Sequence, residues 1–257
     1  MRLKTNPLLA SFRLLTIIGL SGIVYVAYLL RKLPVRDPAG RFEITSRWVR
    51  RWATWVGRIS GVRVTAGCPP PAPPVLLCPN HFGYADILAL AGTTGCFFVA
   101  RADAAEWPLL GPLIRASEQV LVSRKKSRDL ADTSEQIGQL LRAGQAVTVF
   151  LEGTSTGGDR LLPFYPALLK PASETGVAVV PVAMTWSTDQ VGVSVSGDIA
   201  YWGEHNIVTH MWRFMGIGKK SAHIEFGSPR SATGRKRKEL AAELRSEILK
   251  MKGFPVE

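Results

Sequence analysis

The sequence predicts an α/β fold: a mixed sheet flanked by helices, with a membrane-associated helical segment at the N-terminus. Short runs of β-branched and aromatic residues alternate with stretches of helical periodicity, which is typical of layered α/β domains. The expected strands are 75–78, 96–100, 119–123, 146–151, 177–186, 191–196 and 222–226. The last three follow one another without a long helix between them, and this favours a mixed sheet over a purely parallel one.

Helical periodicity falls between several of these strands. The expected helices cover 129–142, 167–174 and 238–251, and another begins near Ile87. With 257 residues, the chain is long enough for one such domain with a sizeable core and a membrane appendage.

One dense apolar run lies near the N-terminus. Residues 14–30, LLTIIGLSGIVYVAYLL, carry no charge. A helix rises about 1.5 Å per residue, so this run covers roughly 25 Å, close to the thickness of the hydrocarbon core of a bilayer. Basic residues flank both ends of this run, so the positive-inside rule does not indicate which end faces the cytoplasm. Two other interpretations stay open: a core helix, and a cleaved signal peptide, although the small-residue cleavage pattern is missing.

The next segment has an amphipathic pattern. One helical face would carry Ile44, Trp48, Trp52, Trp55 and Ile59, and another Arg47, Arg50, Arg51 and Arg58. Tryptophan beside arginine is typical of a bilayer interface, and packing against the protein's own core is the alternative. The proline-rich stretch 67–74 interrupts regular structure. We therefore expect a membrane-anchoring segment over 1–66 and a catalytic domain over 67–257.

Composition restricts the partners. Lysine and arginine outnumber the acids by 32 to 20, which gives a formal net charge of +12 and favours anionic partners such as phospholipid headgroups. Three cysteines without a C-x-x-C pair argue against a disulfide framework or structural zinc and favour a reducing compartment. We expect no bound metal.

A histidine and a carboxylate follow the first expected strand. His81 stands at the strand end, and Asp86 lies five residues later in the first turn of a helix-like stretch. In this geometry the carboxylate folds back onto one imidazole nitrogen and leaves the other free to accept a proton. Such a pair can deprotonate a substrate hydroxyl that then attacks a thioester carbonyl directly. A hydrogen-bonded structural histidine is the alternative interpretation.

Four sequence blocks follow in order, each at a strand end or a strand-to-loop step. They read NHFGYAD at 80–86, VLVSR at 120–124, FLEGT at 150–154 and VPVA at 180–183. In this order they resemble the glycerolipid acyltransferase family typified by 1-acylglycerol-3-phosphate acyltransferases. The resemblance spans about residues 75–186.

The resemblance implies a role for each residue of the blocks. His81 would be the base and Asp86 its partner, Arg124 would bind the substrate phosphate, and Glu152, Gly153 and Thr154 would belong to the acceptor site. Arginine binds phosphate in a bidentate manner, and glycine lets the backbone approach a ligand. Arg124 could instead belong to a solvated basic loop, and Glu152 with Gly153 to a turn.

The resemblance also implies the partners. The acyl donor would be acyl-CoA or acyl carrier protein, used as a substrate without any cofactor, and the acceptor a lysolipid, above all 1-acylglycerol-3-phosphate. The enzyme would act in phospholipid synthesis at the inner cell membrane, with its catalytic domain on the cytoplasmic face.

The third block departs from the family pattern. Many members have Pro before the Glu and Arg after the Thr, where this chain has Leu151 and Ser155. A downstream F-K-x-G pattern becomes FYPA at 164–167. Two expected cations are therefore absent, although Arg160 could compensate. The stretch EGTSTGGDRLLPF at 152–164 more closely resembles the lyso-ornithine lipid acyltransferase branch of the family, whose acceptor is an acylated amino-acid lipid.

Two other classes remain as alternatives. The stretch GTSTG at 153–157 matches the G-x-S-x-G elbow of serine hydrolases, with His205, His210 or His223 downstream, but breakers follow it where a helix is required. A non-enzymatic basic membrane-binding module would suit the charge and the cluster 235–238. No nucleic-acid-binding signature occurs, so we expect no nucleic-acid partner.

Overall fold

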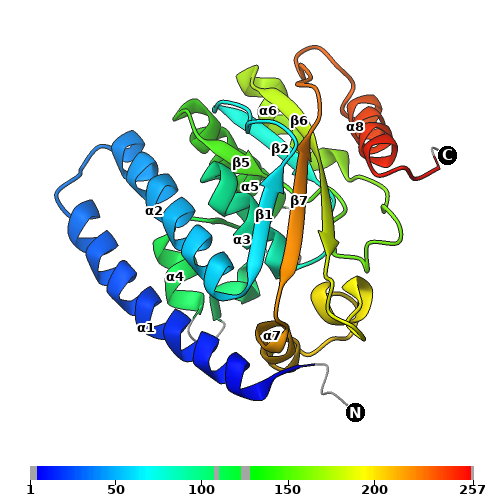
Figure 1. The fold of residues 1–257 in the computed structure, drawn as a ribbon. Helices are drawn as coiled ribbons and strands as arrows, with labels where there is room; N and C mark the ends of the chain where they lie inside the picture. Colours follow the sequence, from blue (N-terminus) through cyan, green and yellow to red (C-terminus); the bar gives the residue numbers. More distant parts are fainter. Residues whose placement is uncertain (1–4, 107–109, 123–127, 256–257) are drawn as a thin grey trace.

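The computed structural model describes residues 5–106, 110–122 and 128–255. They form one seven-stranded sheet in the order β1-β7-β6-β2-β5-β3-β4 (Figure 1). The strands are β1 (Val62–Ala66), β2 (Val75–Pro79), β3 (Phe97–Arg101), β4 (Val120–Val122), β5 (Ala146–Thr148), β6 (Ala178–Ser187) and β7 (Lys220–Phe226). The β6–β7 pair is antiparallel and the other pairs are parallel. The predicted mixed sheet is confirmed.

Helices cover both faces of the sheet. They are α1 (Pro7–Lys32), α2 (Pro38–Ile59), α3 (Tyr84–Thr94), α4 (Leu110–Ala116), α5 (Arg128–Arg142), α6 (Lys170–Thr175), α7 (Ile207–Gly216) and α8 (Arg237–Met251), with single turns η1 (Ala102–Glu106), η2 (Pro166–Leu169) and η3 (Val195–Ile199). The predicted strand at 191–196 is wrong, because these residues form a turn and the start of η3. Strand β1 and helices α4 and α7 were not among the predicted elements.

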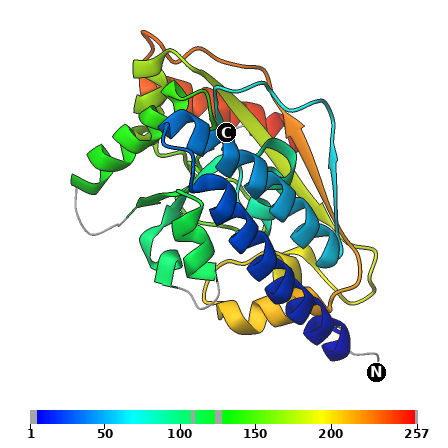
Figure 2. The ribbon, with the colours of Figure 1, turned by 90° about the vertical axis from the view of Figure 1, so that its left-hand side faces the viewer.

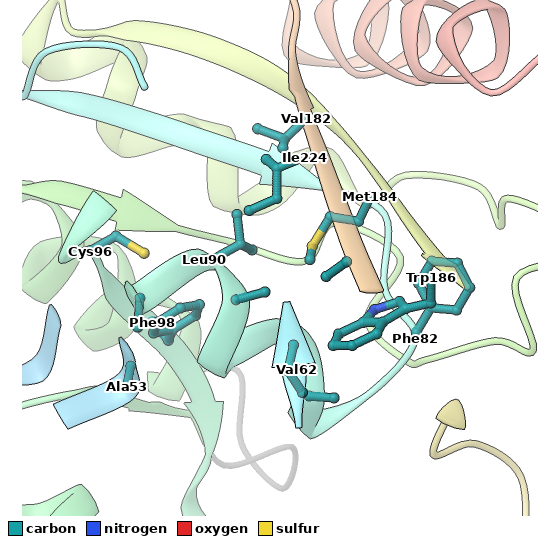
Figure 3. Close-up of a cluster of buried hydrophobic side chains, with 14 of the residues drawn as sticks. Ala53, Val62, Phe82, Leu90, Cys96, Phe98, Val182, Met184, Trp186 and Ile224 are labelled. Atoms are coloured by element: carbon teal, nitrogen blue, oxygen red, sulfur yellow. The ribbon is translucent and has the colours of Figure 1, made fainter. Parts of the chain in front are cut away.

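Two apolar clusters lie on either side of the sheet. One contains residues of α1, α2, α3 and α7, and the other residues of α5, α6 and α8. Strand β2 supplies both, with Val75 and Leu77 in the first and Leu76 and Cys78 in the second. Because both its faces are covered, β2 is a continuous apolar run without polar alternation. Figure 3 shows the first cluster, in which Met184 and Trp186 of β6 lie beside Phe82.

Helix α1 lies along the domain for its whole length (Figure 2). Its buried residues, Ala10, Ser21, Val24, Tyr28 and Lys32, recur from one end of the helix to the other. The opposite face exposes an apolar row consisting of Leu8, Phe12, Leu15, Ile18, Ile23, Val26, Leu29 and Leu30. By length and composition α1 could cross a membrane. An exposed apolar face on a helix that is docked to the domain is consistent with membrane association.

The proline-rich stretch 67–74 joins β1 to β2 within the same sheet. Strand β1 falls within the expected N-terminal segment, yet it pairs with β7. Helix α2 packs against α3 and α1. In the structure the N-terminal segment and the catalytic domain therefore share one sheet and one core.

A single arginine docks the N-terminal half of α1. The guanidinium of Arg13 donates to the carbonyls of Met215 and Ile217, at 2.8 and 2.6 Å, and to that of Gly218 at 2.9 Å. These are carbonyls at and just after the C-terminal end of α7, where a helix favours positive charge.

We expect Arg13→Met to lower the free energy of unfolding by about 2 kcal/mol, because charge-assisted hydrogen bonds are lost and the carbonyls of Met215 and Gly218 lose this donor, although Lys220 still donates to Ile217. Urea unfolding measures the change. Arg47→Met is the matched control, since Arg47 is exposed and pairs with Glu43 one turn away. Equal stability of the two variants would contradict this role of Arg13.

Candidate active site

The four-residue loop after β2, residues 80–83 and called the catalytic loop below, carries the start of the first block, and the first turn of α3 carries its last three residues. Strand β2 lies between β5 and β6 and is parallel to both, so the carboxyl ends of the three strands meet at one edge of the sheet. Open α/β sheets bind ligands at this edge. His81 follows β2, and Phe150 and Glu152 follow β5. The first and third blocks, far apart in the sequence, therefore form one site.

The imidazole of this loop contacts a carboxylate in the first turn of α3. His81 Nδ1 lies 2.8 Å from Asp86 Oδ2. Asp86 is fully buried, and its carboxylate also accepts from the amides of Phe82 and Gly83, at 2.6 and 3.0 Å, and from Trp186 Nε1 at 2.8 Å. A buried carboxylate satisfied in this way accepts the Nδ1 proton, which makes Nε2 the basic nitrogen.

One face of the His81 ring packs against an aromatic ring. It stacks on Phe150, with ring centroids 3.7 Å apart and an interplanar angle of 22°. Its side chain is 18% exposed. In the part of the chain that the structure describes, no hydrogen-bond partner lies on Nε2. The basic nitrogen is therefore available to a substrate hydroxyl.

Glycines allow three backbone segments to meet around the loop. Gly83 has φ +140°, and a Cβ there would lie 2.8 Å from Tyr201 Cβ and 2.9 Å from the Tyr201 carbonyl oxygen. The amide of Tyr201 donates to the Phe82 carbonyl at 2.8 Å. Gly158 has φ +88°, and a Cβ there would overlap the Phe82 ring. Side chains at either glycine would push these segments away from the catalytic loop.

Glu152 ties the third block to the catalytic loop. Its carboxylate accepts from the amides of His81, at 2.9 Å, and Leu162, at 2.8 Å. The Glu152 residue is only 2% exposed, and burial raises the pKa of its carboxyl to about 7. The amide of Thr156 donates to the His81 carbonyl at 2.9 Å. The segment 152–162, called the acceptor loop below, is thus fixed to the residues around His81.

The other expected acceptor-site residues lie in or near this loop. Gly153 has φ +68°, and its α-carbon faces the ring of Tyr165. Gly153 and Thr154 are both exposed. Arg124 lies outside the described residues, so its phosphate-binding role stays a prediction.

Two groups beside the His81–Asp86 pair were not predicted from the sequence. Trp186 supplies an indole donor to Asp86 from β6, and Lys252, just after α8, donates to the Met184 carbonyl at 3.0 Å. The Lys252 ammonium lies 5.1 Å from the Phe82 ring centre. Burial lowers the pKa of Lys252, while Asp86 and Glu152 act in the opposite direction. No sequence pattern marked Lys252, whereas Trp186 lies near the end of the strand that carries the fourth block.

The serine hydrolase interpretation does not fit this geometry. Ser155 Oγ donates to the Tyr201 carbonyl at 2.6 Å, and the chain continues as a loop where an elbow requires a helix. His210 bonds to the Tyr84 hydroxyl and the Ala200 carbonyl, and burial lowers its pKa to about 4. His223 contacts Thr65.

Comparisons with known proteins identify the family of this chain. The Acyltransferase family model matches residues 62–185, which include His81, Asp86 and Glu152. A lyso-ornithine lipid O-acyltransferase from Rhizobium meliloti is 31% identical, over 82% of this chain and 76% of the relative. The chain belongs to the glycerolipid acyltransferase family. As a member of this family it is an enzyme, an acyltransferase.

Relatives of two kinds occur within the family. A lyso-ornithine lipid O-acyltransferase from Pseudomonas aeruginosa is 28% identical, over 95% of this chain and 93% of the relative. A 1-acyl-sn-glycerol-3-phosphate acyltransferase from Neisseria meningitidis is also 28% identical, over 64% of each chain. The crystal structure of the acyltransferase PlsC from Thermotoga maritima shares the fold, with a TM-score of 0.67, 18% identity and coverage of 98% of this chain and 96% of that one.

We expect His81→Ala to lower kcat by at least about 10²–10⁴-fold, the usual contribution of a general base, and Asp86→Asn to lower kcat as well, because the amide no longer stabilises the imidazolium. Steady-state kinetics with a thioester donor measures both. Asp132→Asn on the exposed surface of α5 is the control and should leave kcat unchanged. An active His81→Ala variant would show that this histidine is structural.

Glu152 should make stability depend on pH. Its pKa of about 7 in the folded protein exceeds the ordinary value of 4.5, so the folded state holds more protons between these values. The folded protein therefore loses stability as pH rises from about 4.5 to about 7. Glu152→Gln removes the titration. In urea unfolding, wild type should lose stability relative to this variant between pH 5 and pH 8, and an unchanged difference would refute the assignment.

Proposed function

We propose that this enzyme transfers a fatty acyl group from acyl-CoA or acyl carrier protein to the free hydroxyl of a lysolipid. The observation that carries the proposal is the His81–Asp86 pair, in which Nδ1 is held by a buried carboxylate and Nε2 has no partner among the described residues. The acyl group comes from a soluble thioester, and the acceptor comes from the bilayer beside α1.

The geometry supports direct transfer without a protein nucleophile. The acceptor hydroxyl attacks the thioester carbonyl while its proton passes to His81 Nε2. The tetrahedral intermediate then collapses, the carbon–sulfur bond breaks, and the imidazolium returns the proton to the leaving thiolate. Asp86 stabilises the imidazolium during this cycle, and Phe150 and Trp186 keep the two partners aligned.

Two acceptors suit the site. The order of the four blocks favours 1-acylglycerol-3-phosphate, whose phosphate Arg124 would bind. Ser155 favours lyso-ornithine lipid instead, because many family members have arginine at this position and here the hydroxyl bonds to the Tyr201 carbonyl. The lyso-ornithine lipid O-acyltransferase relative from Pseudomonas aeruginosa, aligned over 95% of this chain, supports the second acceptor.

Arg160 supplies a cation within the acceptor loop. Its guanidinium lies 6.0 Å from the Trp202 ring centre, its side chain is 58% exposed, and its nearest acid, Asp159, is 3.9 Å away. Gly157 packs against the same tryptophan, so the loop and the Trp202 ring form one surface. An anionic headgroup, either phosphate or carboxylate, would bind to Arg160 there.

The proposed location is the inner cell membrane, with the catalytic domain on the cytoplasmic face. The exposed apolar row of α1 would enter the bilayer. A reducing cytoplasm also suits the three cysteines, all of which are free.

Parallel assays with labelled acyl-CoA and acyl carrier protein, on lysophosphatidate and on lyso-ornithine lipid, test the proposal. We expect transfer to one acceptor that requires His81. Arg160→Gln should raise the KM for that acceptor about tenfold, the loss of one charge-assisted contact, with a smaller effect on kcat. Arg142→Gln, an exposed arginine paired with Glu135 on α5, is the matched control. A bilayer-binding protein that transfers to neither acceptor would refute the proposal.

A further inference from the structure

A cavity of about 400 Å³ lies between the α1–α2 pair and the turn that joins α4 to β4. It is lined by Tyr25, Leu29, Lys32, Arg41, Pro112, Arg115, Ala116 and Glu118. It lies at the C-terminal end of α1, whereas α7 packs near the N-terminal end (Figure 1), and His210 of α7 bonds to Tyr84, three residues after His81. The cavity is therefore separate from the active site.

One carboxylate in this cavity holds the helices together. Glu118 accepts from Lys32 Nζ at 2.9 Å and lies 3.4 Å from the hydroxyl of Thr45 on α2. Lys32 Nζ also bonds to the Tyr28 hydroxyl at 2.5 Å, and that hydroxyl donates to the Ala116 carbonyl at 2.7 Å. Glu118 has φ +52°, a left-handed conformation that non-glycine residues rarely adopt. Its contacts maintain this conformation.

The lining carries more positive than negative charge. Lys32, Arg41 and Arg115 face the cavity with Glu118 as the one acid of the lining. Lys32 is buried and satisfied by Glu118, whereas Arg41 is 42% exposed and lies 3.6 Å from the same carboxylate. Arg115 donates to the Ala105 carbonyl and is exposed. One carboxylate cannot neutralise three cations, so the cavity has room and charge for a second anion.

The apolar part of the lining identifies the source of that anion. Tyr25 and Leu29 belong to α1, and Leu29 lies in the exposed apolar row that continues into Val26 and Leu30. The exposed cations Arg31 and Arg36 follow directly along the chain. Cations at the end of an apolar helix lie at the depth of lipid phosphates. A phospholipid would place its phosphate at the arginines and its chains along α1.

We propose that this cavity binds the headgroup of an anionic phospholipid, with Arg41 and Arg115 as the phosphate ligands and Tyr25 and Leu29 against the lipid chains. The site is independent of the acyl-transfer chemistry. Its function is to attach the C-terminal end of the α1–α2 pair to anionic regions of the bilayer. Guanidinium groups suit it because they bind phosphate oxygens in a bidentate manner.

Vesicle co-sedimentation of the full chain tests the site. The vesicles contain either phosphatidylcholine alone or an equimolar mixture with phosphatidylglycerol. The double variant Arg41→Gln/Arg115→Gln is compared with Arg47→Gln/Arg50→Gln, which removes the same charge from exposed positions of α2 outside the cavity. Each basic residue near an anionic surface contributes roughly fivefold to binding. We expect both pairs to weaken binding to the mixed vesicles, and the cavity pair to weaken it at least tenfold more than the control pair.

A loss of equal size in the two double variants would overturn the proposal, because the attraction would then belong to the surface charge as a whole. Arg41→Gln alone repeats the test if the loss of the Arg115–Ala105 bond unfolds α4, and it should account for a severalfold part of the difference. Inorganic phosphate at the same phosphorus concentration is the second arm. Displacement of the protein from mixed vesicles by phosphate as effectively as by short-chain phosphatidylglycerol would show a free-phosphate site and overturn the lipid assignment.

Discussion

The structure of the active site depends on one buried carboxylate. Asp86 binds the imidazole of His81, two amides of the catalytic loop and the indole of Trp186, so it connects β2, α3 and β6 at a single point. A buried charge is stable only when such donors surround it, and the same donors hold the loop in one conformation. The placement of the acceptor loop follows, because Glu152 and Thr156 bond to the backbone of His81. Helices α1 and α7 contribute residues to the apolar cluster that contains Phe82 of the same loop.

The sequence was informative where chemistry requires neighbouring residues. His81 and Asp86 lie five residues apart, and a strand followed by a helix brings them together, so the pair could be predicted from spacing alone. The mixed sheet was predicted from the apolar runs and from closely spaced late strands, yet residues 191–196 are not a strand and α7 lies between the antiparallel β6 and β7 along the chain. Phe150 belongs to the third block and Trp186 lies on the strand that carries the fourth, yet their contacts with His81 and Asp86 depend on the order of strands in the sheet, which local patterns do not determine.

The rest could not be predicted for physical reasons. Strand β1 has one buried residue and four exposed ones, so it lacks the apolar run that marked the central strands. Helix α7 is short and follows a polar turn, and its anchoring carbonyls are bonded by Arg13 from more than two hundred residues away. Lys252 reaches the active site from the C-terminus through the packing of α8 against β6. Such long-range pairings leave no trace in a short window of sequence.

Helix α1 is fixed to the domain at both ends, by Arg13 at α7 and by Lys32 at Glu118. A helix held at one end could act as a tether about which the catalytic domain swings, but a helix held at two ends cannot. The depth and tilt that α1 adopts in a bilayer therefore determine the position of the His81 loop relative to the membrane. Encounters with acceptor then occur by lateral diffusion in two dimensions. The relevant concentration of acceptor becomes the number of molecules per unit area of the leaflet.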